Sequence, residues 1–222
     1  VGGVEHIPAD GPAIIVGNHR SYLDPLAIGY AMAKAGRPVR FLGKKEVFDA
    51  PVVGQIVTAL GGIRVERGSG SDEPLKAAAE ALAAGEAVAI MPQGTIPRGR
   101  AFFDPELKGR WGAAKLAALS GAPVIPIGLW GTEKAWPRNA RTPDVMAVGH
   151  PPTVRIRVGP PVELGLEDPD TDTKAIMAAL VDLLPEEARV HREPTPEELA
   201  RSLPANYQGD LDGETERRPG SD

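Results

Sequence analysis

Short apolar runs alternate with helix-like patterns through about the first 160 residues of the chain. We expect strands at 13–17, 39–42, 63–65, 87–91, 124–129 and 153–158. We expect helices at 25–35, 46–60 (one or two short ones), 73–84 and 111–119. Alternation of strands with helices is typical of α/β proteins. The pattern therefore predicts a single domain with a mixed, mostly parallel central sheet flanked by helices.

The pattern changes after Pro161, where proline and acidic residues dominate. Helical spacing returns at about 173–184 and 196–203, and the polar residues 211–222 are expected to be disordered. The acidic run at 168–173 lacks the glycine and glutamate of a calcium loop, so we interpret it as a helix-capping loop. We place a folded domain at 1–165 and an acidic, Pro-rich, partly helical extension at 166–222.

Charge divides at the same place. Residues 1–160 carry 19 Lys and Arg against 14 Asp and Glu, whereas residues 161–222 carry 6 against 16. The whole-chain net charge of −5 therefore hides a mildly basic body, which suits an anionic partner. Nucleic acid is a poor candidate, because the basic excess is modest and the aromatic residues, 5% of the chain, are not interleaved with it.

Composition excludes several kinds of chemistry. The chain has no cysteine, hence no disulfide, no thiolate nucleophile and no cysteine-based metal site. Its four histidines form no pair with metal-ligand spacing, so we expect no metal. The chain has no run of about 18 apolar residues, so no transmembrane helix is predicted, and its first residues have no signal-peptide pattern.

The segment Gly17-Asn18-His19-Arg20-Ser21-Tyr22-Leu23-Asp24-Pro25 lies where a buried strand meets a helix. Such junctions are the usual place for a site in an open α/β sheet. His19 can act as a general base near neutral pH, and Asp24 is close enough to hold its ring. The competing interpretation is structural: Asp24 followed by Pro25 is also a good helix N-cap.

Three further blocks follow. Residues 61–67, GGIRVER, place Arg64 and Arg67 at or just after a strand end, where guanidinium groups can bind phosphate or simply be solvated. Residues 91–95, MPQGT, form a turn after a buried strand that could hold an anion or be an ordinary turn. Residues 121–128, GAPVIPIG, are an apolar strand bracketed by prolines.

In this order the four blocks resemble those of glycerolipid acyltransferases of the lysophosphatidic acid (1-acylglycerol-3-phosphate) acyltransferase type. That family carries N-H-x₄-D, a G-x-I-x-V-x-R-like block, P-E-G-T and a V-P-I-I-P-like strand. The matching residues here are Asn18-His19 with Asp24, 61–67, 92–95 and 122–127. The resemblance covers about residues 1–165 and implies the family's α/β fold for the predicted domain.

The resemblance implies that His19 is the general base and that Asp24 orients it. Direct acyl transfer would follow from acyl-CoA or an acyl carrier protein to 1-acyl-sn-glycerol-3-phosphate, with no covalent enzyme intermediate and no bound cofactor. It also assigns residues to the acceptor. Arg64 and Arg67 would bind the acceptor phosphate, Gln93, Gly94 and Thr95 would bind the acceptor, and Arg98, Arg100 and Arg110 are secondary anion-binding candidates.

Two departures put the acceptor's identity in question: Gln93 replaces the family's glutamate, and Ile96 replaces an arginine that often follows Gly-Thr. Glycerol-3-phosphate or another lysophospholipid is therefore an alternative acceptor. A thioesterase and a non-catalytic lipid-binding module are alternatives from other classes. Ser21 lies on no nucleophile elbow, and we expect its hydroxyl to bond local backbone.

The lipid substrates suggest a membrane surface as a partner. Arg37, Arg40, Lys44 and Lys45 precede the apolar stretch 47–63, and basic residues beside an apolar surface favour anionic headgroups. A buried helix with solvated flanking charges is the alternative. On this basis we expect a cytoplasmic protein, peripheral on the cytoplasmic face of the membrane.

Overall fold

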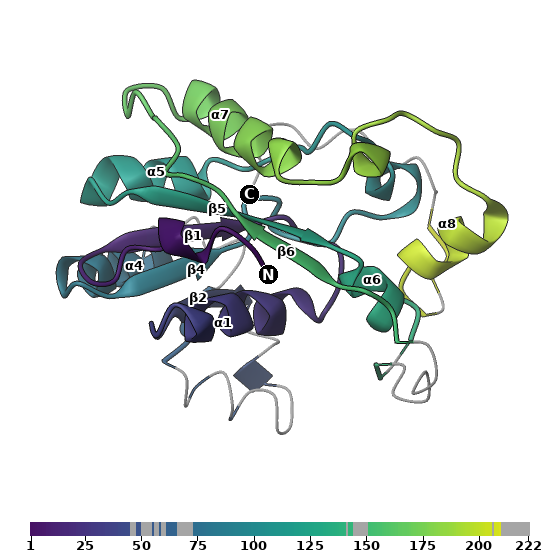
Figure 1. The fold of residues 1–222 in the computed structure, drawn as a ribbon, viewed down its shortest axis with the longest axis horizontal. Coiled ribbons are helices and arrows are strands. Elements are labelled where there is room, and N and C mark those ends of the chain that lie inside the picture. The colour runs from purple at the N-terminus through teal and green to yellow at the C-terminus, as the bar shows by residue number, and fades with distance from the viewer. Residues whose placement is uncertain are drawn as a thin grey trace.

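The computed structural model describes residues 1–44, 48–49, 55, 58, 61–65, 73–140, 142–143, 151–205 and 207–209. Six strands form one sheet in the order β3-β2-β4-β1-β5-β6 (Figure 1). They are β1 (Ala13–Gly17), β2 (Arg40–Lys44), β3 (Ile63–Val65), β4 (Ala87–Ile90), β5 (Val124–Trp130) and β6 (Arg155–Val158). Strands β1 to β5 pair in parallel, and β6 is antiparallel to β5. The predicted α/β fold with a mostly parallel sheet is confirmed.

Helices cover both faces of the sheet, so its central strands have no polar face. The described helices are η1 (Val4–His6), α1 (Asp24–Lys34), α4 (Glu73–Ala83), η2 (Gly99–Phe102), α5 (Gly112–Ser120), α6 (Thr132–Ala135), α7 (Pro169–Asp182), η3 (Glu186–Ala188) and α8 (Pro196–Ser202). In Figure 1, α5 and α7 lie above the sheet and α1 lies below it. The helix that we expected within 46–60 falls mostly outside the described residues.

Strand β1 divides its side chains between two apolar layers. Ile14 and Val16 pack with α4, α5 and α7, whereas Ala13 and Ile15 pack with α1. All five residues of β1 are buried, as expected for a central strand of a parallel sheet. A strand anchored on both faces is a rigid base for the loop that follows it.

Arg37 is a buried arginine that connects the loop before β1 with the loop before β4. Its side chain donates hydrogen bonds to the carbonyl oxygens of Pro8, Asp10, Gly11 and Gly85, and the residue is only 6% exposed. Expecting Arg37 to face a membrane was therefore wrong, because four backbone carbonyls already hold its guanidinium. Arg40 is also engaged, since it donates to the carbonyl of Gly61 and pairs with Glu86 at 2.9 Å. Lys45 lies outside the described residues.

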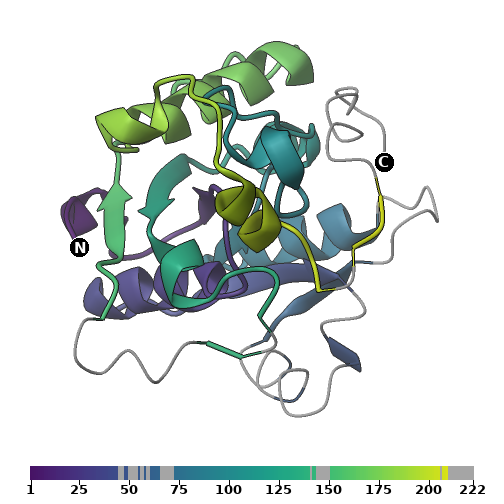
Figure 2. The same ribbon diagram turned by 90° about the vertical axis from the view of Figure 1, so that its right-hand side faces the viewer.

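The segment after residue 165 contributes to the core. Ile176, Met177 and Leu180 of α7 lie in the same apolar cluster as Ile14 and Val16. Asp168 caps α7 through the N–H groups of residues 170 and 171, which confirms the capping role, but residues 169–173 of the acidic run form the first turns of the helix and not a loop. Helix α8 begins with a capping box between Thr195 and Glu198 and packs on η2 (Figure 2). The tail 210–222 is outside the described residues.

Candidate active site

The carboxyl ends of three adjacent strands bring three segments together. His19 follows β1 by two residues, Gln93 follows β4 by three, and Thr132 follows β5 by two. Because β4, β1 and β5 are neighbours and parallel, these ends share one edge of the sheet. Ligand sites of open α/β sheets form at such an edge. The first and third sequence blocks thus meet there, beside the end of the strand that contains most of the fourth block.

His19 and Asp24 form the centre of this edge. Nδ1 of His19 lies 2.8 Å from Oδ2 of Asp24. The imidazole is 18% exposed and the carboxylate is fully buried. A carboxylate can only accept, so Nδ1 carries the hydrogen, and in the neutral imidazole this leaves Nε2 with its lone pair. This tautomer has the proton acceptor that a general base requires.

The loop folds around Asp24 rather than Asp24 capping the helix. Oδ2 accepts the backbone N–H groups of Arg20 at 2.6 Å and Ser21 at 2.7 Å, in addition to His19. Helix α1 begins at Asp24 itself, and no side chain caps it. The N-cap interpretation is therefore wrong: Asp24 turns back into the loop and fixes its backbone.

Thr132 holds the other oxygen of the same carboxylate. Its hydroxyl donates to Oδ1 of Asp24 at 2.6 Å, and both residues are fully buried. Sequence reasoning did not single out Thr132. The available signal was its place two residues after a buried strand, the same position that His19 has after β1.

Gln93 contacts the His19 backbone. Its Oε1 accepts the N–H of His19 at 2.6 Å, and the residue is 4% exposed. Only the amide oxygen can accept, so this bond fixes the orientation of the amide. A glutamate at this position would offer the same acceptor, which explains how glutamine can replace it. Gly94 and Thr95 follow in the same turn, half-buried.

Two further loop residues bond to the backbone on the β5 side. Asn18 donates to the carbonyl of Leu129 at 2.9 Å and accepts its N–H at 2.7 Å, so its amide extends the pairing of β1 with β5. Ser21 donates to the carbonyl of Trp136 at 2.7 Å and accepts the N–H of Leu23 at 3.1 Å. The expectation that Ser21 bonds local backbone is confirmed, because Leu23 is two residues on. Its hydroxyl hydrogen is occupied, which disfavours a nucleophilic role.

Arg20 is an internal brace. Its guanidinium lies 4.3 Å from the ring centroid of Phe102 and 4.2 Å from that of Trp130, and it pairs with Glu133 at 3.2 Å. Cation–π contacts gain strength when the cation is shielded from water, as it is here. Arg20 therefore links the loop that carries His19 and Asp24 to η2 and β5. Its positive charge points into the protein and not towards solvent.

The second block lies farther away. Strand β3 is three strand spacings from β1, about 14 Å across the sheet. Arg64 is exposed, lies 3.5 Å from Asp49 and stands over the ring of Phe48. Arg67, the other phosphate candidate, falls outside the described residues. The structure thus brings Arg64 to the sheet's edge and not beside His19.

The secondary anion-binding candidates lie on the segment that follows the third block. Arg98 stacks over Tyr207 at 5.2 Å, Arg100 pairs with Glu193, and the backbone N–H of Arg110 donates to the carbonyl of Pro92. Ile96, which replaces an arginine of the family pattern, is buried. Arg138, which sequence reasoning missed, donates to the carbonyls of Ile96 and Pro97 and so braces this segment.

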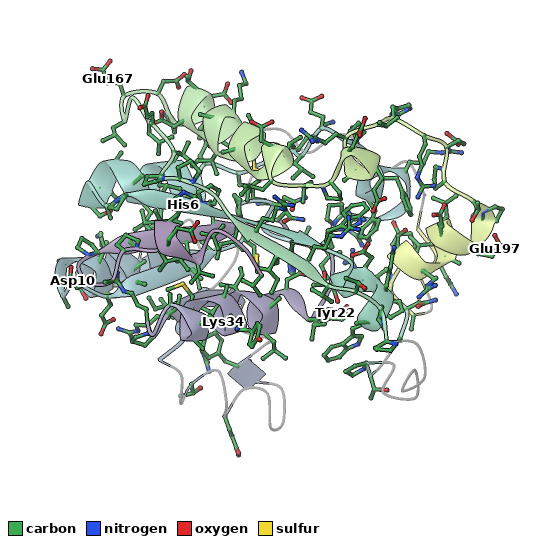
Figure 3. The ribbon with its side chains drawn as sticks, viewed as in Figure 1. His6, Asp10, Tyr22, Lys34, Glu167 and Glu197 are labelled. Carbon is green, nitrogen blue, oxygen red and sulfur yellow. The ribbon has the colours of Figure 1, made fainter. Side chains whose placement is uncertain are left out.

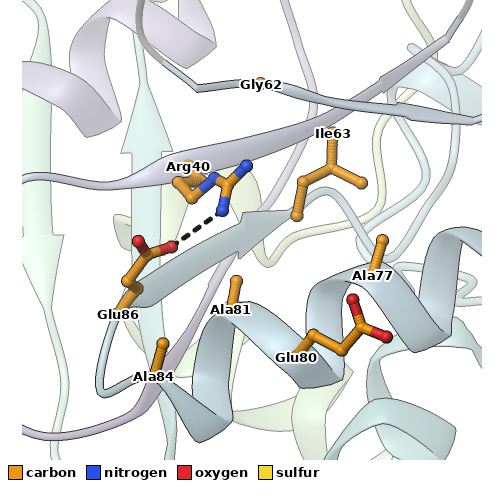
Figure 4. Close-up of a pocket in the computed structure, with 8 residues that line it drawn as sticks. All are labelled: Arg40, Gly62, Ile63, Ala77, Glu80, Ala81, Ala84 and Glu86. Carbon is orange, nitrogen blue, oxygen red and sulfur yellow. Dashed lines mark hydrogen bonds and ion pairs between the residues drawn. The ribbon is translucent and has the colours of Figure 1, made fainter.

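A hollow of about 320 Å³ lies between α4 and the starts of β2 and β3, lined by Arg40, Ile63, Ala81 and Glu86 among others (Figure 4). Arg40, Ile63 and Glu86 lie at or just before the amino ends of the parallel strands β2, β3 and β4, opposite the edge that carries His19. The hollow is therefore not part of the candidate active site. Within the described residues there is no cluster of three metal-ligating side chains and no helix able to cross a bilayer.

Comparison with known proteins decides the family. The model of the protein family described as Acyltransferase matches residues 1–130, more than half of the chain. The chain belongs to the acyltransferase family. The match includes the loop with His19 and Asp24 and ends on β5, so it covers the three strand ends that form the site.

Individual acyltransferases agree with this assignment. The chain is 33% identical over 142 residues to the chloroplastic 1-acyl-sn-glycerol-3-phosphate acyltransferase BAT2 of Brassica napus, a match covering 62% of this chain and 39% of that protein. It is 32% identical over 149 residues to the 1-acyl-sn-glycerol-3-phosphate acyltransferase of Borreliella burgdorferi. That match covers 63% of this chain and 54% of that protein. The chain thus spans about two fifths to one half of these relatives.

A solved structure is similar throughout most of the fold. The crystal structure of the 1-acyl-sn-glycerophosphate (LPA) acyltransferase PlsC from Thermotoga maritima superposes with a TM-score of 0.60 at 25% identity. The superposition covers 82% of this chain and 70% of that one. It therefore extends beyond the 59–63% of this chain that the curated relatives match.

Proposed function

We propose that this chain transfers an acyl group from a thioester, acyl-CoA or acyl carrier protein, to the free hydroxyl of 1-acyl-sn-glycerol-3-phosphate, which gives phosphatidic acid. The observation that carries the proposal is the 2.8 Å contact between Nδ1 of His19 and buried Asp24, which leaves Nε2 as a proton acceptor. The chain has no cysteine to act as a nucleophile, and the hydroxyl of Ser21, the serine of the same loop, is bonded to backbone.

The reaction proceeds in one direct transfer. Nε2 of His19 takes the proton of the acceptor hydroxyl as that oxygen attacks the carbonyl carbon of the thioester. The carbon–sulfur bond then breaks, and the leaving thiolate receives the proton from His19. Asp24 stays hydrogen-bonded to Nδ1 throughout and stabilises the imidazolium that forms in between. Acyl transfer from a thioester needs no resident cofactor.

The choice of acceptor draws on the relatives. The two curated relatives described above are 1-acyl-sn-glycerol-3-phosphate acyltransferases, and the family block that carries Gln93 is retained apart from its carboxylate. Arg64 and Arg67 remain the proposed phosphate ligands, with Arg98, Arg100 and Arg110 as secondary ones. An exposed ion pair such as Arg64 with Asp49 is weak, so it can open for a phosphate.

Because this acceptor and its product are lipids, we also propose that the protein works at a membrane surface, as a peripheral protein on the cytoplasmic face. The enzyme must then reach an acceptor whose acyl chain lies in the bilayer. Catalysis at the interface places the glycerol hydroxyl near the headgroup level, where a site at the rim of a sheet can reach it.

The test is an acceptor panel. Protein is incubated with acyl-CoA and, separately, with 1-acyl and 2-acyl lysophosphatidic acid, glycerol-3-phosphate and a phosphate-free lysolipid, while CoA release and the acylated product are both measured. We expect phosphatidic acid from the 1-acyl acceptor and CoA released in equal amount. Preference for glycerol-3-phosphate would contradict the acceptor. CoA release without any acceptor would replace acyl transfer by thioester hydrolysis.

A further inference from the structure

The outward side of α1 and of the turn before it carries large apolar side chains, here called the outer stripe: Tyr22, which lies two residues before α1, and Leu26 and Tyr30 of the helix. They are 47%, 60% and 53% exposed. A spacing of four residues places Leu26 and Tyr30 on one side of the helix, about 6 Å apart along its axis. Tyr22 precedes the first turn of α1, so the stripe begins in the loop that carries His19.

Helix α1 is apolar on both sides. Its inner side buries Ala27, Ile28, Ala31 and Met32 against the sheet. Its exposed positions are Leu26, Tyr30, Ala33 and Lys34, with no exposed carboxylate among them. A helix that is apolar all round is normally buried, and contiguous exposed apolar surface marks a binding face.

The other helices that cover the sheet differ. Helix α4 presents Glu73, Lys76 and Glu80 to solvent, and α7 presents Lys174 and Asp182. Helices α4, α5 and α7 share the opposite side of the sheet, whereas α1 packs on the other side with the short η1 beside it. The outer stripe is therefore the outermost layer of its side among the described residues.

The chemistry of the stripe fits a lipid interface. At one end, the ring of Tyr22 meets the ring of Trp136 edge-on, with centroids 5.7 Å apart. At the other end, Nζ of Lys34 stands 5.3 Å from the ring centroid of Tyr30. Tyrosine and tryptophan beside lysine are the residues that anchor proteins at headgroup level.

Charge favours an anionic surface. Lys34 is the exposed charge of α1, and Lys134 of α6, two residues before Trp136, is exposed as well. Figure 3 labels Tyr22, at one end of the outer stripe, and Lys34, beyond its other end. Lysines that flank an apolar surface add attraction to anionic headgroups, because their ammonium groups stay in water while the stripe enters the interface.

We propose that the outer stripe of α1 docks this protein on an anionic lipid bilayer. Tyr22 follows His19 by three residues, so a bilayer on the stripe lies beside the loop that carries the proposed base. The inference rests on the proposed function, because docking would serve to bring the lipid acceptor to His19. It does not use the stretch 37–63, in which Arg37 and Arg40 are held by internal contacts and most of residues 45–60 lie outside the described residues.

The test is vesicle flotation of the chain with a double variant and a matched control. Leu26→Glu with Tyr30→Glu changes the stripe without touching the proposed active site. Leu119→Glu is the control, because Leu119 is 63% exposed on α5, on the opposite side of the sheet. We expect wild type and control to bind vesicles containing phosphatidylglycerol, and the double variant to bind at least about 10-fold less. Vesicles of phosphatidylcholine alone should bind less than the anionic ones.

Activity measurements separate docking from chemistry. With short-chain donor and acceptor below their micelle concentrations, the double variant should retain wild-type turnover, and with vesicle-borne acceptor it should lose most of it. If neither wild type nor variant turns over either form of the acceptor, the proposed function is wrong. The flotation result would still decide the docking surface.

Four results would overturn the docking surface. They are flotation of the double variant at the wild-type level, equal loss in the Leu119→Glu control, no flotation of wild type, and a wild-type dimer that the double variant abolishes. The last result would show that a second copy covers the stripe. If the charged variant lowers the thermal midpoint, Leu26→Gln with Tyr30→Gln repeats the comparison without charge at these surface sites.

Discussion

The hydroxyl of Thr132 donates a hydrogen bond of 2.6 Å to Oδ1 of Asp24, across 108 positions of the chain. The other oxygen of that carboxylate holds His19 and two backbone N–H groups. Thr132 therefore fixes the plane of the carboxylate, and through it the direction in which the imidazole points. In the proposed mechanism it is a positioning residue that contacts neither substrate.

Replacing Thr132 tests this role. Thr132→Val leaves a buried carboxylate oxygen without its donor, and a lost buried partner costs about 1–3 kcal/mol. We expect kcat to fall roughly 10-fold, with the KM of donor and acceptor unchanged, and Thr132→Ser to restore most of it. Steady-state kinetics of the three proteins provide the check. An equal loss in Thr132→Ser would show that shape, and not the hydroxyl, matters.

Substitutions at Gln93 test whether this residue positions His19 or binds the acceptor. Gln93→Glu keeps an oxygen for the N–H of His19, whereas Gln93→Leu removes it. We expect Gln93→Leu to lower kcat at an unchanged acceptor KM, and Gln93→Glu to keep the larger share of activity. The quantity to measure is the split between kcat and KM. A raised acceptor KM at constant kcat in Gln93→Leu would instead make Gln93 an acceptor ligand.

Arg37 should matter for stability and not for membrane contact. Its guanidinium serves four carbonyl groups from two separate loops, and each hydrogen bond to a charged group contributes about 1.5–3 kcal/mol. We expect Arg37→Ala to lower the free energy of unfolding by at least about 3 kcal/mol, measured by urea denaturation. The folded fraction should float with anionic vesicles as wild type does, and reduced flotation of folded protein would contradict this.

The pairing of Glu198 with Arg192 gives a pH signature. Bidentate hydrogen bonds from Arg192, helped by the N–H of Thr195, lower the pKa of Glu198 from its ordinary 4.5 to about 2. A lowered carboxyl pKa stabilises the folded state fully above the ordinary value, and the contribution is lost as the pH falls towards 2. We expect Glu198→Gln to melt below wild type at pH 7.

That difference should shrink between pH 4.5 and about 2, where Glu198 becomes protonated in wild type too. Thermal melts of both proteins across this range measure it. A gap that stays constant down to pH 2 would assign the stabilisation to the shape of the side chain and not to its charge.

Much of the fold follows from patterns that are local in sequence. The strand at 63–65 has the predicted bounds, and β4 and α4 each end one residue before the predicted limit. Such agreement is expected where apolar runs end at glycine or proline, because these residues interrupt regular structure. The start of α7 lies four residues before the predicted helix, since Asp168 and Pro169 cap it earlier than the apolar spacing shows.

The site divides in the same way. His19 and Asp24 were found because their partnership spans five residues and carries a recognisable motif. Thr132 and Arg138 act on segments 108 and 42 positions away, and no local pattern records such contacts. The sequence also does not show which basic side chains are buried. Arg20 and Arg37 point inward, and only the structure distinguishes them from surface cations.

The most direct measurement compares His19→Ala with wild type in acyl transfer from acyl-CoA to 1-acyl lysophosphatidic acid, with CoA release and phosphatidic acid followed together. A general base contributes about 10²–10⁴ in rate. We expect the variant to lose at least roughly 10²-fold in kcat, while its thermal midpoint and acceptor binding stay near those of wild type. Equal turnover of the two proteins would contradict the assignment of His19 as the base.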